Sequence, residues 1–317
     1  MISGPMTSRK AARYLLVIFI IFTLNFIIPR AMPGDPMTNL FGEDAVVSES
    51  SMTELRRDMG LDKPVFLQYI DYWSRILHFD LGYSYHFHSK VSELIMSKMI
   101  WTLILVGPSI ILGGVTGTIF GAIAGWRRDD TKNRLLTTTV LIIYSSPPYF
   151  LSILVMYIFS FKLCIFPLKG FYLSLSPGDV VYHMALPILM MSLFSASRNY
   201  TIMRGSVIQE KHVPYVAYAR AKGLFGDEIL FSHIFKNALL PIITVLALDF
   251  GFIFSGALFI EIVFSLNGMG NLIYDAILSR DYPVLQGAFL IITLMIVFAN
   301  LIADMLYGLL DPRVRWQ

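Results

Sequence analysis

The chain has 317 residues, of which 56% are hydrophobic and 15% carry a charge, and its mean hydropathy is +0.64. Because soluble domains carry roughly 25% charged residues, this composition excludes an ordinary soluble protein and predicts an integral membrane protein. Membrane topology accounts for the formal net charge of +3, which requires no nucleic-acid partner. The single cysteine, Cys164, excludes an internal disulfide.

Six segments are apolar enough to cross a hydrocarbon core of about 30 Å, which needs roughly 20 mostly apolar residues. We predict an all-α integral membrane protein that forms a single domain over residues 1–317. Its six transmembrane helices are expected at about residues 14–29, 101–125, 135–161, 184–203, 238–262 and 286–310. The first segment is not a typical signal peptide, because no small-residue cleavage site follows it.

Lysine and arginine residues indicate the orientation of the spans. With both termini in the cytoplasm, the inner segments contain 15 of the 25 basic residues. Most of the others lie in one long outer loop, residues 30–100, which the positive-inside rule largely ignores. We therefore predict a multi-pass protein of the cytoplasmic (inner) cell membrane with both termini cytoplasmic.

The outer loop carries two helix signatures. Ser51 and Glu54 have the spacing of a capping box, and Gly60 suits the position after that helix. A second helix is predicted to begin at Pro64. Its apolar residues recur every three or four positions and give one apolar face, formed by Phe66, Tyr69, Ile70, Trp73, Ile76 and Leu77. This face either packs on the membrane domain or lines a route for a solute or partner.

The second span carries an unbroken four-residue ladder of glycines on one helix face. Such ladders let helix backbones approach closely, so we predict a packing seam at Gly113, Gly117, Gly121 and Gly125. Prolines inside or beside spans bend helices and suit a bundle around a cavity. They therefore indicate a translocation pathway, and they lie at Pro108, Pro147, Pro148, Pro187 and Pro241.

A cytoplasmic loop, residues 204–237, contains its own short helix. Pro214 suits the first helical position and Gly223 the position after the last. The helical period places four residues near one side, namely Tyr215, Tyr218, Ala219 and Lys222. On periodicity alone, the helix either docks into a groove of another protein or lies on lipid headgroups.

The stretch from Tyr215 to Leu224, followed by Lys236-Asn-Ala-Leu-Leu-Pro241, resembles the coupling-loop signature of binding-protein-dependent ABC importer permeases of the type I fold. It is most similar to the dipeptide, oligopeptide and nickel branch. Further segments resemble that branch in the same order, namely Pro33–Pro36, Gly60–Pro64, Phe79–Gly82, Glu261–Phe264, Arg280–Pro283 and Leu310–Arg313. The long loop after the first span resembles the first of the two permeases in such systems.

This resemblance implies six spans with a cytoplasmic coupling helix. It also implies a second homologous permease, two ATP-binding subunits, an extracytoplasmic solute-binding protein and membrane lipid as partners. The implied ATPase-docking residues are Tyr215, Ala219, Arg220, Ala221, Lys222 and Gly223. Two positions depart from the pattern: Pro214 replaces an acidic residue and Tyr218 a common threonine, so one acidic contact to the ATPase is expected to be missing.

The chain lacks the signatures of nucleotide chemistry and of common hydrolases. It has no G-x-x-x-x-G-K-[ST] loop, so ATP and magnesium are expected only on partner subunits, and no cofactor is expected on this chain. No H-E-x-x-H, G-x-S-x-G or paired C-x-x-C motif occurs either. We therefore predict a permease subunit that is not an enzyme.

Ionisable residues deep in a membrane are costly and usually face a bundle interior or water. Asp249 and Asp304 therefore either line the solute path or bind a partner within the bundle, such as Asn300 for Asp304. Arg198 is expected to serve as an anchor or local ion-pair partner. The segment from Glu261 to Gln286 resembles an outer gate of the family, but it also fits a packed re-entrant loop. The candidate pathway or gate residues are Asp249, Glu261, Asn267, Gly268, Gly270 and Asp281.

The predicted function is an ATP-driven importer permease that works by alternating access, and the expected cargo is a di- or oligopeptide. Nickel, a metal chelate or another small solute is the alternative cargo. His86 and His88 could ligate a soft cation, but without further ligands they are expected to be solvated and no metal site is predicted. The alternative from another class is a channel or ion-coupled secondary transporter with Asp249 and Asp304 as coupling sites.

Overall fold

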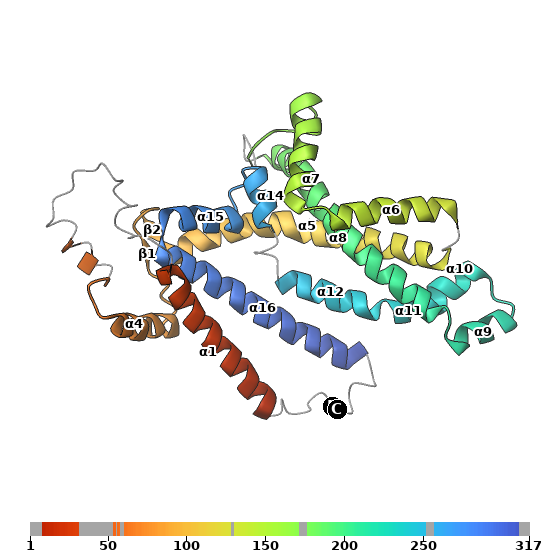
Figure 1. Ribbon diagram of the computed structural model, residues 1–317, viewed down its shortest axis with the longest axis horizontal. Helices are drawn as coiled ribbons and strands as arrows, with labels where there is room; N and C mark the ends of the chain where they lie inside the picture. The colour runs from red at the N-terminus through yellow and green to blue at the C-terminus, as the bar shows by residue number, and fades with distance from the viewer. Residues whose placement is uncertain are drawn as a thin grey trace. The chain divides into compact units, whose positions relative to one another are not determined.

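The computed structural model describes residues 8–31, 53–54, 56–57, 60–127, 130–170, 176–251 and 257–310. These residues are almost entirely helical, and one short hairpin pairs β1 (Tyr83–Ser84) antiparallel with β2 (Ser89–Lys90) (Figure 1). The chain divides into two compact units, Met1–Ile100 with Asn271–Val297, and Trp101–Gly270 with Phe298–Gln317. The capping residue Ser51, the Pro33–Pro36 motif and the motif beyond Leu310 lie outside the described residues.

The first unit packs α1 (Ser8–Ala31) and α4 (Val65–Leu77) with the first half of α16 (Tyr282–Leu310). It also contains the start of α5 (Val91–Trp126) and most of α15 (Met269–Ser279). As predicted, Gly60 adopts a left-handed φ of +65° where the preceding helical residues end, and α4 starts directly after Pro64. The core joins Phe22 and Phe26 of α1 to Tyr72 of α4.

The packed face of α4 differs from the predicted one. The side that meets α1 is aromatic: Tyr72 is buried, Trp73 stacks on Phe19, and Tyr69 meets Phe26 edge to face. Three residues of the predicted apolar face are exposed instead, namely Phe66, Ile70 and Leu77. Only the stripe of α4 that faces the aromatic rings of α1 is buried, so the other apolar residues of α4 stay exposed.

The second unit contains the other helices. Before the cytoplasmic loop these are the rest of α5, α6 (Thr131–Ser145), α7 (Pro148–Val155), the π-helical η1 (Met156–Lys162) and α8 (Pro177–Glu210). After it come α9 (Pro214–Ala221), α10 (Gly226–Ile229), the π-helical η2 (Leu230–Ile234), α11 (Phe235–Ala238), α12 (Leu240–Gly251) and α14 (Leu258–Val263).

Three helices are long and apolar enough to cross a membrane, namely Val91–Trp126, Pro177–Glu210 and Tyr282–Ile302. Two bent pairs raise the count to five if each is one span, and Leu16–Ala31 is a shorter apolar helix. The predicted third span is not one continuous helix: it bends by 107° between Ser145 and Pro148. Pro147 is extended there, and a proline cannot donate the backbone hydrogen bond that would continue the helix. The described residues thus contain the apolar helices expected, without fixing the number of spans at six.

The four glycines of the ladder lie directly against α8. A Cβ at Gly117 would stand 2.3 Å from the carbonyl oxygen of Ala196, and one at Gly121 would stand 2.6 Å from that of Tyr200. Such distances leave no room for any side chain. The same close approach holds at the two ends of the ladder, Gly113 and Gly125. The backbones of α5 and α8 are therefore in contact along three turns.

Candidate docking site and buried polar groups

Helix α9 begins and ends where the sequence predicts. Pro214 occupies its first position, where the missing N–H would have no helical acceptor. Gly223 follows with a φ of +83°, and its N–H donates to the carbonyl oxygen of Arg220 at 2.9 Å. The left-handed conformation there favours glycine over any residue with a Cβ.

An apolar cluster packs against the inner face of α9. Val216 and Ala219 of α9 pack with Ile229, Leu230 and Ile234 of the segment that follows. The cluster continues into the preceding and following helices through Ala122, Met203, Val207, Ala238 and Ile242. Because all ten residues are at most 6% exposed, α9 is held to α5, α8 and α12 by a packed core and is not a free loop.

Tyr215 ties the start of α9 to both of its neighbours. Its hydroxyl is 2.6 Å from Oε2 of Glu210, at the end of α8, and accepts from Nδ2 of Asn237 at 3.3 Å. Burial and the hydrogen bond to Glu210 raise the pKa of Tyr215 to about 12. The phenol is therefore protonated at neutral pH and can donate to the Glu210 carboxylate.

Trp126 forms a second support that sequence reasoning missed. Lys211 Nζ donates to its carbonyl oxygen at 3.0 Å, and the Arg220 guanidinium lies 5.6 Å from its ring centre. A Cβ at Gly226 would stand 3.2 Å from its Nε1. In the sequence, the one feature that could have pointed to Trp126 is that it directly follows Gly125, the last glycine of the ladder. An exposed ion pair, Arg127 with Asp227 at 2.6 Å, lies beside it.

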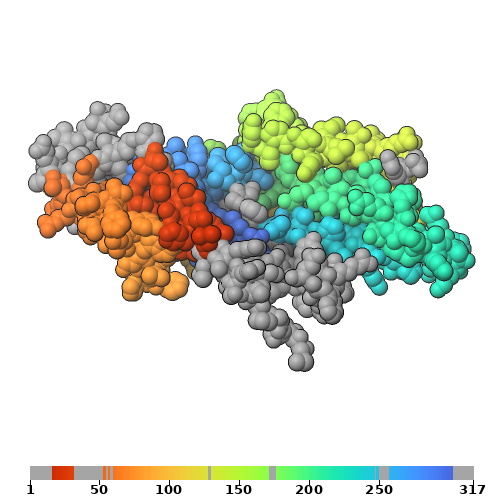
Figure 2. Space-filling view, turned by 60° about the horizontal axis from the view of Figure 1, so that its bottom comes forward, coloured from red at the N-terminus to blue at the C-terminus, as the bar shows by residue number. Residues whose placement is uncertain are grey.

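The exposed side of α9 carries most of the predicted docking residues. Tyr218 is 74% exposed, and Ala217, Arg220, Ala221, Lys222 and Gly223 are exposed as well. Figure 2 shows this segment on the surface, in the blue-green of residues near 220. Ala219 differs from these residues, because its side chain is 6% exposed and packs in the chain's own core, and its role in docking stays a prediction. Tyr215 is likewise half-buried and bonded within the chain, since the core occupies the side of the helix on which both residues lie.

Glu261 is fully buried at the start of the predicted gate segment. Its Oε1 accepts from the Thr102 hydroxyl and its Oε2 from the Gly270 N–H, both at 2.7 Å. The Thr102 hydroxyl accepts in turn from the Met269 N–H at 2.8 Å. A Cβ at Gly268 would stand 2.3 Å from Oε1, so the loop closes tightly over the carboxylate. Thr102 was not foreseen, because a threonine in an apolar run carries no signal of its own.

This network makes residues 261–270 a packed loop. Asn267 is exposed, as is Ser265, whereas Gly268 and Gly270 are buried. Such packing matches the alternative of a re-entrant loop, and a role as a gate stays a prediction.

Asp281 caps a helix in the first unit. Its Oδ1 accepts from the Val284 N–H at 3.2 Å in the first turn of α16, and its Oδ2 accepts from the hydroxyl of Ser84 on β1. The residue is 6% exposed, and burial raises its pKa above the ordinary value, against the opposing effect of the two hydrogen bonds. The geometry gives Asp281 a role in joining the hairpin to α16.

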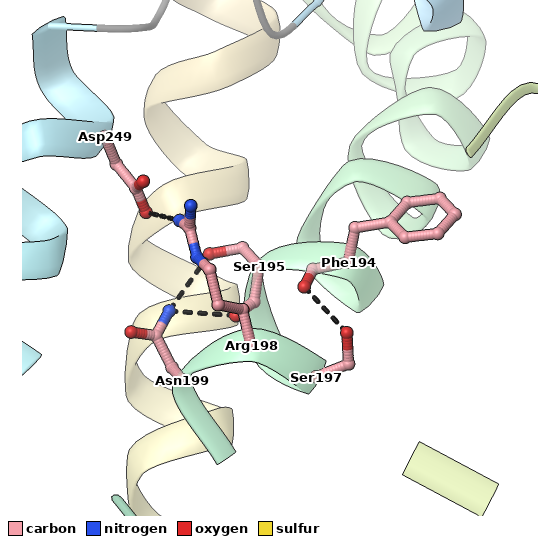
Figure 3. A network of polar contacts seen from close by, with 6 residues as sticks. All are labelled: Phe194, Ser195, Ser197, Arg198, Asn199 and Asp249. Atoms are coloured by element: carbon pink, nitrogen blue, oxygen red, sulfur yellow. Dashed lines mark hydrogen bonds and ion pairs between the residues drawn. The ribbon is translucent and has the colours of Figure 1, made fainter. Parts of the chain in front are cut away.

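Asp249 is 8% exposed and forms an ion pair with Arg198, which joins α12 to α8 (Figure 3). Beside the pair, Asn199 Nδ2 donates to the carbonyl oxygen of Ser195 at 2.8 Å. Arg198 is thus a local ion-pair partner, which is one of the two roles expected from the sequence. The side chain of Asp304 lies outside the described residues.

His86 and His88 lie in the turn between β1 and β2. Within the described ranges, no group of three or more histidine, cysteine, aspartate or glutamate residues could hold a metal ion.

A family model described as the binding-protein-dependent transport system inner membrane component matches residues 117–316. A companion model for the N-terminal part of such membrane components matches residues 6–106. The chain belongs to this family. Its predicted resemblance to ABC importer permeases is therefore confirmed, together with the helical membrane fold, and the chain is a permease subunit and not an enzyme.

Several curated relatives span nearly the whole chain. The identity is 33% over 299 residues with a putative peptide permease protein of Brucella ovis, covering 92% of this chain and 93% of that one. It is 31% over 315 residues with a probable peptide ABC transporter permease protein of Sinorhizobium fredii, covering 99% and 100%. With a di/tripeptide transport system permease protein of Pseudomonas aeruginosa it is 30% over 331 residues, covering 98% of each chain.

Proposed function

We propose that this chain is one of two homologous permeases that together enclose the pathway of an ATP-driven peptide importer. The observation that carries the proposal is α9: a short, partly basic helix whose outer face is free of other described residues and whose inner face is packed on α5, α8 and α12. A surface helix that only lies on lipid needs no such core beneath it.

In the proposed mechanism, the exposed side of α9 docks in a groove of an ATP-binding subunit. Two such subunits bind ATP and magnesium, and nucleotide binding brings the two subunits closer to each other. Because Val216 and Ala219 belong to the same core as Met203 and Val207 of α8, a displacement of α9 moves the adjoining end of α8 with it. ATP binding and hydrolysis then shift the population between inward-open and outward-open states.

The cargo is proposed to be a di- or tripeptide or a longer peptide, as the names of the three relatives suggest. An extracytoplasmic solute-binding protein delivers it to the outer side, and both termini of this chain face the cytoplasm. The family's description as a binding-protein-dependent inner membrane component supports such a partner.

A co-purification tests the docking step. The tagged chain is isolated from its native membrane in mild detergent, and its partners are identified and counted by mass spectrometry. We expect one similar permease and two copies of an ATP-binding subunit. Ala221→Glu, on the exposed face of α9, should lose the ATPases while keeping the second permease.

Ser232→Glu is the matched control, because it places the same charge at an exposed helical position of the same loop, outside α9. It should retain all partners. Recovery of the chain alone, or retention of the ATPases by Ala221→Glu, would contradict docking through α9 and favour an ion-coupled transporter.

A further inference from the structure

The first unit contains a cavity of about 420 Å³ that the transport mechanism does not use. It lies between the end of α1, one side of α4, the β1–β2 hairpin and the first turns of α16, and every residue that lines it belongs to this unit. Its lining is unusually rich in groups that donate hydrogen bonds or carry positive charge.

Three cations line the cavity: Arg30 on α1, Arg75 on α4 and Lys90 on β2. Arg30 is held in place, because its Nε and Nη2 donate to Gln68 Oε1 at 3.2 and 3.0 Å and its Nη1 donates to the Phe26 carbonyl oxygen at 3.1 Å. These acceptors are neutral, so they position the guanidinium without cancelling its charge.

Two carboxylates also line the cavity, against three cations, and one of them, Asp71, interacts electrostatically with Arg75 as well as with Lys63. Asp71 forms a salt bridge of 2.6 Å with Lys63, which lies outside the lining. Asp80 accepts from the Gly82 N–H at 2.9 Å. Over the described part of the chain, none of the three lining cations forms a salt bridge. The cavity is therefore net positive.

Two further lining groups are buried without a hydrogen-bond partner among the described residues, the Tyr72 hydroxyl and Gln286 Nε2. Tyr72 is 8% exposed, so more than nine-tenths of it is buried. Buried polar groups are nearly always satisfied, and an exception requires an explanation. Both atoms can donate a hydrogen bond. Together with Arg75 and Lys90, they are donors without an acceptor among the described residues, whereas Arg30 already donates to Gln68 and Phe26.

We propose that this cavity binds a phosphate group, either from the headgroup of a phospholipid or as free phosphate. A phosphate offers several acceptor oxygens and up to two negative charges, which matches the donors and the excess of positive charge better than a single carboxylate does. The rings of Tyr72 and Tyr282 flank the site, and tyrosines of this kind are frequent at the level of lipid headgroups.

Binding is tested on the full-length chain, purified with its partners in a neutral detergent. The probes are inorganic phosphate, a water-soluble short-chain phosphatidylglycerol, and the corresponding short-chain diacylglycerol, which lacks phosphate. Bound probe is counted by native mass spectrometry, and the midpoint of thermal unfolding is followed because a ligand that binds only the folded state raises it.

We expect the phosphate-bearing lipid, inorganic phosphate, or both to bind and raise the midpoint, whereas the diacylglycerol does not. Arg75→Gln combined with Lys90→Gln should weaken binding by about tenfold or more, because two charge-assisted contacts are lost. Both side chains are exposed, so the double variant should fold normally.

The control removes two exposed lysines outside the cavity, Lys162→Gln with Lys169→Gln, and should bind like the parent chain. Binding of the lipid alone identifies the headgroup as the source, and binding of inorganic phosphate at equal strength identifies the free ion. The proposal is overturned if neither phosphate-bearing probe binds, or if the Arg75 and Lys90 variant binds as well as the control.

Discussion

The three carboxylates that are buried in the described part of this chain each have specific partners, and the kind of partner differs from site to site. Glu261 is held by a hydroxyl and a backbone N–H, Asp281 caps a helix, and Asp249 faces an arginine. Sequence reasoning grouped the three as candidate pathway residues. Their contacts show that each of them joins two parts of the fold, and a role in the pathway stays a prediction. Each contact is expected to respond differently when it is altered.

Glu261→Gln should lower the free energy of unfolding by about 1–3 kcal/mol, because an amide N–H₂ would face a group that already donates. The measurement is the midpoint of thermal unfolding of the detergent-purified chain. Glu228→Gln is the same change at an exposed position and should have no measurable effect. Equal stability of the two variants would refute a structural role for the buried carboxylate.

Breaking the pair between Asp249 and Arg198 should also be costly, because the remaining charge would lose its partner in a largely buried place. We expect Asp249→Asn to cost about 2–4 kcal/mol, somewhat below a fully buried pair because Arg198 is partly exposed. The same change in the exposed pair, Asp227→Asn, should have little effect, because solvent screens both charges. A double-mutant cycle on each pair measures the two coupling energies, and similar values would contradict this difference.

Asp281 should make stability depend on pH. Burial raises its pKa above the ordinary 3.8, so the folded chain binds this proton more tightly than the unfolded chain does. Its favourable contribution is complete below pH 3.8 and is lost as the pH rises through the higher folded pKa. Asp281→Asn keeps the cap on α16, so it should be at least as stable as the parent at pH 7, with an advantage that shrinks toward pH 4.

Parallel thermal-unfolding series from pH 4 to pH 7 measure that difference. Asp281→Ala should be less stable than Asp281→Asn by about 1 kcal/mol across the whole range, because the cap itself is gone and neither side chain titrates. An Asp281→Asn variant whose deficit grows toward pH 7 would show that the charged carboxylate is favourable and would contradict the expected sign of the pH dependence.

At the scale of helices, local chemistry was predictable from the sequence and packing directions were not. The ends of α9 follow from Pro214 and Gly223, and the start of α4 follows from Pro64, because caps depend on a few neighbouring residues. The burial of Ala219 and the aromatic face of α4 depend on which neighbour reaches each helix in space. The 107° bend after Ser145 likewise turned a predicted span into two pieces, since prolines mark a break without giving its angle.

The seam between α5 and α8 gives a sharp prediction at this scale. Gly117→Ala should cost about 1–3 kcal/mol or more, because its methyl group would stand 2.3 Å from the Ala196 carbonyl oxygen in a region where both backbones are fixed. Gly107→Ala lies on the same helix with nothing within 4 Å of the new atom, so it should be neutral or stabilising. Comparing the folded yield and unfolding midpoint of the two variants tests the seam, and equal behaviour would mean that the helices do not meet there.

At the scale of the whole molecule, the chain is a permease subunit, and in the proposed mechanism its energy comes from partner ATP-binding subunits. The exposed face of α9 and the core beneath it provide the proposed connection. Membership of the family was accessible from motifs in the sequence. The buried contacts of Thr102 and Trp126 were not, because single residues without a spacing pattern carry no such signal.

The most direct test of the central claim is peptide uptake into proteoliposomes that contain this chain with its co-purified partners. A solute-binding protein and a labelled dipeptide are added outside the vesicles. ATP with magnesium is enclosed inside them, where the ATP-binding subunits face it. We predict uptake that requires ATP and is abolished by Ala221→Glu but not by Ser232→Glu. Uptake that proceeds without ATP, follows an ion gradient and is lost only with Asp249→Asn would contradict coupling through α9.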